Sequence, residues 1–144
     1  TAFADGKLNR DVAVVVRNQG PQSNGMPELH SLTPVLSNIQ DQGHTVMLIT
    51  DGRMSGASGR VPAAIHVTPE AKNGGAIGQI QNGDIITLDA ASGVLSVDAD
   101  LSRRPRAEAP VSEGGFGREL FSDMRDQAAS AEHGGGINLL RRYQ

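Results

Sequence analysis

Two apolar runs in the first third of the chain have the length and composition of buried β-strands. Residues 11–17 are a nearly continuous run of β-branched side chains, and residues 45–49 form a second run that ends at Thr50. Short runs of this kind are typical of strands that are covered on both faces of a sheet. The polar segment before the first run predicts a linker, and residues 18–27, with two glycines and two prolines, predict a loop.

The segment between the two runs has the periodicity of an amphipathic helix. Apolar side chains recur at three- and four-residue intervals, at Leu29, Leu32, Leu36 and Ile39. Pro27 suits a first helical turn, Glu28 suits the positive end of the helix, and Gly43 suits its C-terminal stop. Pro34 lies inside the stripe, which indicates a kink or two shorter helices. A strand–helix–strand order predicts that the two strands pair in parallel.

After residue 60 the pattern changes to shorter runs. Residues 61–67 are apolar and fit either a helix or a strand, and residues 68–75 fit a short helical turn that is closed by glycine. Three runs with a β-type pattern follow, at residues 76–80, 84–89 and 94–98. The last two runs flank a Ser-Gly pair, and Asn-Gly stands before them, which predicts hairpin turns.

The C-terminal third predicts a connector and a helix within a single domain of residues 1–144. Residues 101–115 contain two prolines and three arginines, and we expect an exposed connector with solvated basic side chains. A helix is expected at about 116–132, ended by the glycines at 134–136. Its apolar face consists of Phe116, Leu120, Phe121, Met124, Ala128 and Ala131. This face belongs either to the core or to a surface that docks on another part of a longer chain.

The glycine-rich loop that follows the second run is the main candidate for a functional site. Residues 50–60 contain glycines at 52, 56 and 59, arginines at 53 and 60, and Ser55 between them. Glycine lets backbone amides approach a ligand, and successive N–H groups form a concave surface that suits an oxygen anion. Ligands of α/β sheets bind where strands end at their carboxyl side. A plain surface turn with no ligand has the same composition.

The composition argues against several classes of function. The 144-residue chain has a net charge of −3 and no long basic run, which argues against binding to nucleic acid or to anionic lipid. It has no apolar stretch of membrane-spanning length and no signal-peptide pattern, so we expect a cytoplasmic protein without a membrane partner. Because it contains no cysteine, it offers no disulfide and no thiolate ligand for a metal. The first residue is Thr1, which suggests a fragment.

Few side chains near the loop offer chemistry. Glu28 suits a hard cation such as Mg²⁺, although a carboxylate that only stabilises a helix start has the same pattern. Arg53 and Arg60 suit a carboxylate or phosphate on a substrate, or they solvate the loop. Asp51 fits a metal ligand, a base or a turn cap. Ser55 has no triad partner at a recognisable spacing and needs a neighbouring base or metal to react.

Several blocks, in the same order, resemble the carboxyl-terminal domain of the dihydroxy-acid/sugar-acid dehydratase family. They are Gln19-Gly20-Pro21, Gly25-Met26-Pro27-Glu28-Leu29, Thr50-Asp51-Gly52-Arg53-Met54-Ser55-Gly56, His66-Val67-Thr68-Pro69-Glu70-Ala71 and Asn82-Gly83-Asp84-Ile85-Ile86. Within the family, residues 26–30, 55–66 and 117–121 look most like the branch that acts on 6-phosphogluconate in the Entner–Doudoroff pathway. The resemblance covers residues 5 to 130.

The resemblance implies one domain of a larger dehydratase. Family members carry an iron–sulfur cluster on cysteines of an amino-terminal domain; we expect the 4Fe-4S type, although the sequence does not decide the type of cluster. Their carboxyl-terminal domain has a swivelling β/β/α fold, which is an α/β arrangement with a barrel-like mixed sheet flanked by helices. The hydroxyl group at C3 of the substrate would leave at the cluster's open iron, and the enol product would tautomerise to 2-dehydro-3-deoxy-6-phosphogluconate.

The resemblance also implies roles for particular residues. Ser55 matches the serine that removes the proton from C2, and Glu28 matches a carboxylate that joins a Mg²⁺ site built mainly by the other domain. The substrate-binding candidates are Arg53, Gly56, Ser58 and Arg60. The two arginines are chosen for their charge rather than for a motif.

Three functions remain open on the sequence. The first is the catalytic part of an iron–sulfur dehydratase, inactive alone, whose partners are the amino-terminal domain, a phosphorylated sugar acid and, in the full-length protein, a second copy in a homodimer. The second is a free-standing module of the same fold that binds a phosphorylated sugar acid or a partner subunit without chemistry. The third keeps the dehydratase chemistry and changes the substrate to another sugar acid or to a branched dihydroxy acid.

Overall fold

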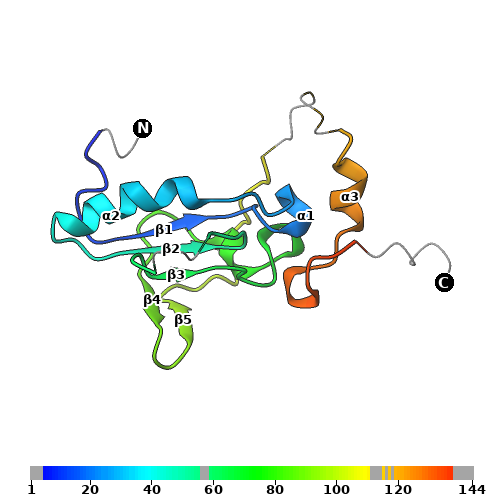
Figure 1. Cartoon of the computed structure of the whole chain (residues 1–144). Helices are drawn as coiled ribbons and strands as arrows, with labels where there is room; N and C mark the ends of the chain where they lie inside the picture. The colour runs from blue at the N-terminus through cyan, green and yellow to red at the C-terminus, as the bar shows by residue number, and fades with distance from the viewer. Residues whose placement is uncertain (1–4, 56–58, 111–114, 116, 118, 138–144) are drawn as a thin grey trace.

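A three-stranded parallel sheet lies at the centre of the chain (Figure 1). The structure is a computed structural model and describes residues 5–55, 59–110, 115, 117 and 119–137. The strands β1 (Val12–Val16), β2 (Val46–Thr50) and β3 (Ala63–Ala64) lie in the order β1-β2-β3. The parallel register of β1 and β2 confirms the pairing predicted from the sequence, and the ambiguous run 61–67 supplies the short strand β3.

The helix expected from Pro27 to Gln42 begins later. A 3₁₀ turn, η1 (His30–Leu32), leads into the helix α2 (Thr33–Asp41). Proline is tolerated in the first turn of a helix because its missing N–H group has no partner there, so Pro34 stands in the first turn of α2 instead of kinking a longer helix. The prediction of a helix start at Pro27 was therefore wrong.

A second correction concerns the loop before this segment. Residues 18–27, predicted as irregular, contain the short helix α1 (Pro21–Asn24). Pro21 stands in its first turn, and Gly25 ends it in the left-handed conformation with a φ of 72°.

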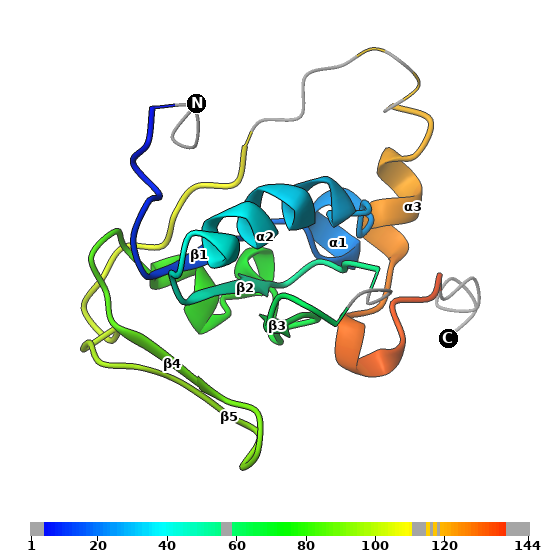
Figure 2. The same cartoon turned by 60° about the vertical axis from the view of Figure 1, so that its left-hand side comes forward.

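Apolar clusters cover both faces of the sheet. The first lies under α2, which runs along one face of the sheet in Figures 1 and 2, and comprises Leu36, Ile39, Val46, Leu48 and Val61. The second lies on the opposite face and contains Ile49, Ala71 and Ile77, from β2 and the 3₁₀ turns η2 (Ala71–Asn73) and η3 (Ala76–Gln79). The residues of β1 are only half-buried because β1 is an outer strand, whereas β2 is central and almost wholly buried.

A β-hairpin projects from the domain (Figure 2). Its strands β4 (Ile86–Asp89) and β5 (Val94–Val97) pair in antiparallel register, as the turn signals predict. The first of the three predicted β-type runs, residues 76–80, contains η3 instead of a strand, and alanine and glycine in that run have low strand propensity. Within the described residues the two sheets are separate, so the expected barrel-like sheet is not formed and the fold is mixed α/β. The swivelling arrangement stays a prediction.

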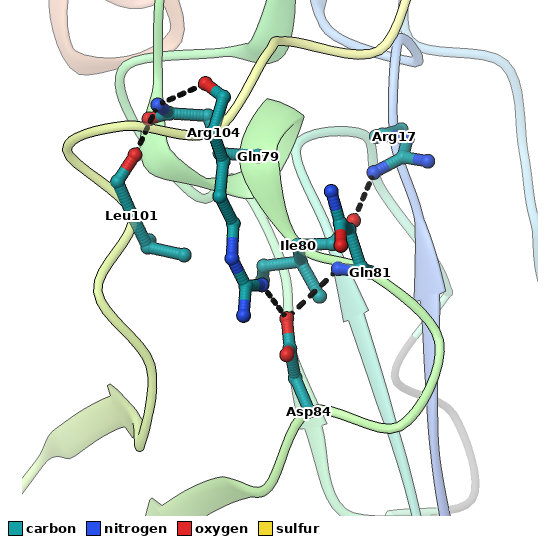
Figure 3. A network of polar contacts seen from close by, with 7 residues as sticks. All are labelled: Arg17, Gln79, Ile80, Gln81, Asp84, Leu101 and Arg104. Atoms are coloured by element: carbon teal, nitrogen blue, oxygen red, sulfur yellow. Dashed lines mark hydrogen bonds and ion pairs between the residues drawn. The ribbon is translucent and has the colours of Figure 1, made fainter.

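A polar network fixes the base of the hairpin to the connector (Figure 3). Arg104 donates to the Asp84 carboxylate at 2.6 Å, and the Gln81 amide donates to the same oxygen at 2.8 Å. Gln79 reaches the connector by donating to the Leu101 carbonyl oxygen at 2.6 Å. The Arg104 guanidinium first, and then the Gln81 amide, hold the pKa of Asp84 below its ordinary value. Arg104 is thus a structural residue, contrary to the expectation of a wholly solvated basic cluster.

The C-terminal region holds less helix than expected. The helix α3 (Ser122–Gln127) is followed by a 3₁₀ turn, η4 (Ala131–His133), which Gly134 ends. Leu120, Phe121 and Met124 are 74%, 50% and 48% exposed, so this apolar face is not part of the core. Phe116 lies outside the described residues. No described helix combines the length and apolar character that crossing a membrane requires.

Candidate functional site

The candidate site lies where the chain leaves the carboxyl ends of β1 and β2. Because these strands are parallel, the segments that follow them meet at one edge of the sheet. Glu28 and Arg53 face each other in an isolated parallel bridge, and the Leu29 amide donates to the Arg53 carbonyl oxygen at 3.2 Å. This pairing extends the contact between the two segments beyond the sheet.

Glu28 occupies the donor-rich turn that the sequence assigned to an external anion. Its Oε1 atom accepts hydrogen bonds from the backbone amides of Ser55 at 2.8 Å and His30 at 2.9 Å. Its Oε2 atom accepts from Arg53 Nη1 at 2.9 Å, while Arg53 Nε donates to the Met26 carbonyl oxygen at 2.7 Å. These donors therefore bind a carboxylate of the protein itself.

These contacts set the charge of Glu28. The Ser55 amide above all holds the pKa of the Glu28 carboxyl below its ordinary value; desolvation opposes this, and the His30 amide and the Arg53 guanidinium add smaller lowering effects. Glu28 is therefore a carboxylate at neutral pH. Its side chain is 36% exposed, so an approaching group can reach it.

Ser55 is exposed at the end of this arrangement and borders a hollow of about 270 Å³. Most of the residues that line the hollow are apolar, and the full set is Thr33, Met54, Ser55, Gly59, Val61, Pro62, Ala63 and Ile65. Thr33 Oγ1 donates to the Met54 sulfur at 3.2 Å, and this contact fixes one wall. An apolar wall beside a serine hydroxyl suits the carbon skeleton of a small molecule better than its charged groups.

The other substrate-binding candidates are paired within the chain or fall outside the described residues. Arg60 forms an ion pair with Asp41 at the end of α2, and its carbonyl oxygen accepts from Gln40 Nε2 at 3.4 Å. Arg53 is held by Glu28, so both arginines already have partners within the chain. Gly56 and Ser58 fall on residues that the structure does not describe.

Two buried carboxylates lie behind the site. Asp51 is 0% exposed and accepts the backbone amides of Asn18, Gln19 and Ala71 at 2.9–3.0 Å, so it joins two distant segments of the chain rather than capping the turn that follows β2. Glu70 is 2% exposed and accepts the amides of Gln22 and Ser23 at 3.1 and 3.0 Å. The role of Glu70 was not predicted from the sequence. Gly20 was a signal of it, because a side chain at position 20 would have no room beside Glu70.

Glu28 is the outward-facing carboxylate of this arrangement, and it suits one oxygen ligand of a Mg²⁺ ion. The residues that the structure describes contain no group of three or more His, Cys, Asp or Glu side chains placed to hold a metal ion. A Mg²⁺ site that includes Glu28 would thus take its other ligands from elsewhere.

Comparisons with known proteins connect this geometry with a family. The sequence profile for the carboxyl-terminal part of dihydroxy-acid/6-phosphogluconate dehydratases matches residues 1–135. A phosphogluconate dehydratase of Zymomonas mobilis is 57% identical over 136 residues, which are 92% of this chain and 22% of the relative. The relative from Rhizobium meliloti, also a phosphogluconate dehydratase, is 55% identical over 141 residues, with 94% and 23% covered.

A relative from another branch is more distant. The dihydroxy-acid dehydratase of Koribacter versatilis is 42% identical over 141 residues, which are 92% of this chain and 24% of that protein. The chain thus spans about a quarter of the length of the curated relatives that it matches. The family inferred from the sequence blocks is confirmed: the chain belongs to the dihydroxy-acid/6-phosphogluconate dehydratase family and corresponds to the carboxyl-terminal part of its members.

Proposed function

We propose that this chain is the carboxyl-terminal domain of a hydro-lyase that dehydrates 6-phospho-D-gluconate to 2-dehydro-3-deoxy-6-phosphogluconate. The observation that carries the proposal is the direct contact between the Glu28 carboxylate and the Ser55 amide, which joins the two proposed functional residues in one exposed site. The similarity to phosphogluconate dehydratases, at 57% and 55% identity, supports the choice of substrate.

In this proposal Ser55 is the base. Its Oγ atom, in the ionised form, takes the proton from C2 of the substrate. The electron pair of the broken C–H bond forms a double bond between C2 and C3, and the C3–O bond breaks, so that hydroxide leaves and is protonated to water. The resulting enol at C2 tautomerises to the ketone. A serine hydroxyl is a weak base on its own, which is why its surroundings matter.

Glu28 would contribute one oxygen ligand to a Mg²⁺ ion. When bound, this ion would favour the ionised form of a nearby hydroxyl and neutralise negative charge on the substrate. The iron–sulfur cluster implied by the family finds no thiolate ligand here, because the chain contains no cysteine. We therefore assign the cluster to another part of a longer protein, and we assign none of the cluster's chemistry to this chain.

The substrate's charged groups would bind to the arginines. Arg53 lies in contact with Glu28 and is the candidate for binding the substrate's carboxylate. That carboxylate would take the place of the Glu28 carboxylate as the partner of Arg53. Arg60 would bind the phosphate after leaving Asp41, an exposed pair that costs little to break. Gly56 and Ser58 complete the proposed substrate loop. The proposed partners are the amino-terminal domain of the same enzyme and, in the full-length protein, a second copy in a homodimer, in the cytoplasm.

The proposal can be tested with a chimera. This chain would replace the corresponding carboxyl-terminal part of the Zymomonas mobilis relative, and dehydration of 6-phosphogluconate would be measured anaerobically. We expect turnover by the chimera and none by the 144-residue chain alone. Ser55→Ala should keep the fold and lose most of the turnover, whereas Ser96→Ala, at an exposed position of β5, should leave it unchanged.

The same assay separates the alternatives. The similarity to a dihydroxy-acid dehydratase favours, as a second candidate, a branched dihydroxy acid as substrate. Turnover of a dihydroxy acid or of unphosphorylated gluconate in place of 6-phosphogluconate would move the assignment within the family. A folded chimera that binds 6-phosphogluconate but dehydrates none of these acids would instead indicate a binding module.

A further inference from the structure

The loop that delivers Glu28 to the site is fixed from behind by the two buried carboxylates. Asp51 Oδ1 accepts the Gln19 amide at 2.9 Å, and Asp51 Oδ2 accepts the Asn18 amide at 3.0 Å. Glu70 accepts two amides further along the loop, those of Gln22 and Ser23. Four backbone N–H groups that no strand pairs with are thereby satisfied inside the protein, where an unpaired group would be costly.

The two carboxylates form one unit. The amide of Ala71, the residue after Glu70, donates to Asp51 Oδ2 at 2.9 Å. Asp51 therefore joins the end of β2, the loop after β1 and the turn η2. With 0% and 2% exposure, Asp51 and Glu70 lie beyond the reach of a substrate or a cation, and the mechanism proposed above does not use them.

The same loop ends at the site. After the left-handed turn at Gly25, the Met26 carbonyl oxygen accepts from Arg53, and Glu28 accepts from Ser55. Arg53 and Ser55 lie close behind Asp51 in the chain, separated from it by Gly52 and Met54. The segment after β2 thus holds the start of the loop through Asp51 and its end through Arg53 and Ser55, and the two sets of contacts close a ring.

We propose that Asp51 and Glu70 are positioning residues, which set the placement of the Glu28 carboxylate against Ser55 by fixing residues 18–23. They act through the backbone of the loop and touch neither substrate nor metal. The consequence for turnover rests on the proposed function, whereas the consequence for the contact between Glu28 and Ser55 does not.

Amide hydrogen exchange of the full chain, measured by NMR, tests the placement. In Asp51→Asn one acceptor oxygen becomes an N–H donor that faces backbone N–H groups. We expect the amides of Ser55 and Leu29, which join the two segments, to exchange about tenfold faster. The amide of Leu48 in the central strand should keep its rate, which shows that the fold is intact.

A matched control is available in the hairpin. Asp89 accepts the amides of Ala91 and Ser92 and the Ser92 hydroxyl, so Asp89→Asn makes the same chemical change at a distant turn. It should leave the exchange of Ser55 unaltered. If Asp51→Asn does not fold, Glu70→Gln provides the test, because it weakens the hold on Gln22 and Ser23 alone. Wild-type exchange at Ser55 in a folded variant of either residue would overturn the proposal.

Activity gives a separate readout. In an active chimera, Asp51→Asn should raise the Mg²⁺ concentration needed for half-maximal rate more than it lowers the rate at saturating Mg²⁺, since Glu28 is displaced rather than removed. An unmoved Mg²⁺ requirement would contradict the role in positioning. If the unsubstituted chimera is inactive, the proposed function fails, while the exchange experiment still decides the placement.

Discussion

Replacing Gly20 by alanine tests the tight contact between the loop after β1 and the buried Glu70 carboxylate. Gly20 has a φ of −65° and a ψ of 174°, a conformation that alanine adopts without strain. An added Cβ would lie 2.3 Å from Glu70 Oε2 and 2.5 Å from its Cδ atom. Because Glu70 is 2% exposed, its carboxylate has no open space into which to move.

The expected loss follows from the hydrogen bonds that the displaced carboxylate leaves. Glu70 holds the amides of Gln22 and Ser23, and a hydrogen bond to a charged acceptor contributes about 1.5–3 kcal/mol. A lower entropy of the unfolded chain returns about 0.4–1 kcal/mol for a change from glycine to alanine. With partial relaxation of the loop, we expect Gly20→Ala to lower the free energy of unfolding by about 2–4 kcal/mol.

Urea unfolding followed by far-ultraviolet circular dichroism measures this loss. The matched control is Gly136→Ala, at a position with no positive φ and no atom within 4 Å of an added Cβ. It should leave stability unchanged or raise it by up to about 1 kcal/mol. In a Glu70→Ala background the cost of Gly20→Ala should fall, because the carboxylate atoms are gone and the Cβ at 2.8 Å remains. Equal stability of Gly20→Ala and the wild type would refute the reasoning.

Three further predictions concern the core, the polar network and the site. Ile39→Ala should cost about 3–4 kcal/mol in urea unfolding, because the side chain is fully buried under α2. Asp84→Asn should destabilise the protein at neutral pH. The pKa of Asp84 is lower in the folded state than in the unfolded state. The difference in stability between Asp84→Asn and the wild type should therefore be complete above about pH 3.9 and vanish as the pH falls through the folded-state pKa. A stability difference that does not change with pH would contradict this. Glu28→Gln in the chimera should weaken Mg²⁺ binding without unfolding, so titration with Mg²⁺ should show a higher concentration at half-maximal rate, and an unchanged titration would count against the role of Glu28.

The central sheet could be predicted because its signals are local. The β-branched run of β1 and the apolar run of β2 each carry enough hydrophobicity to indicate a strand, and their separation fixes a parallel pairing. The helix that was missed depends on a distant residue. The helix α1 is held by Glu70, 47 or 48 residues further along the chain, and no periodicity within four residues reveals such a contact.

The placement of the glycine-rich loop at the end of β2 was predictable, and its contacts were less so. One amide of this loop, that of Ser55, does donate to a carboxylate, but the carboxylate is that of Glu28. Glu28 was placed at a helix start because Pro27 suits that position, whereas pairing with Arg53 holds the segment extended. The roles of Ser55, Arg60 and the other substrate candidates stay predictions.

The parallel bridge between Glu28 and Arg53 has a consequence for protein engineering. A graft of residues 50–60 alone, taken from a relative with another substrate, would bring new backbone donors to a carboxylate loop shaped for the old ones. Residues 18–29 would have to be exchanged in the same step, together with the Glu70 that supports them. The unit of transfer is therefore a pair of segments, and libraries that randomise one loop at a time would sample mostly mismatched pairs.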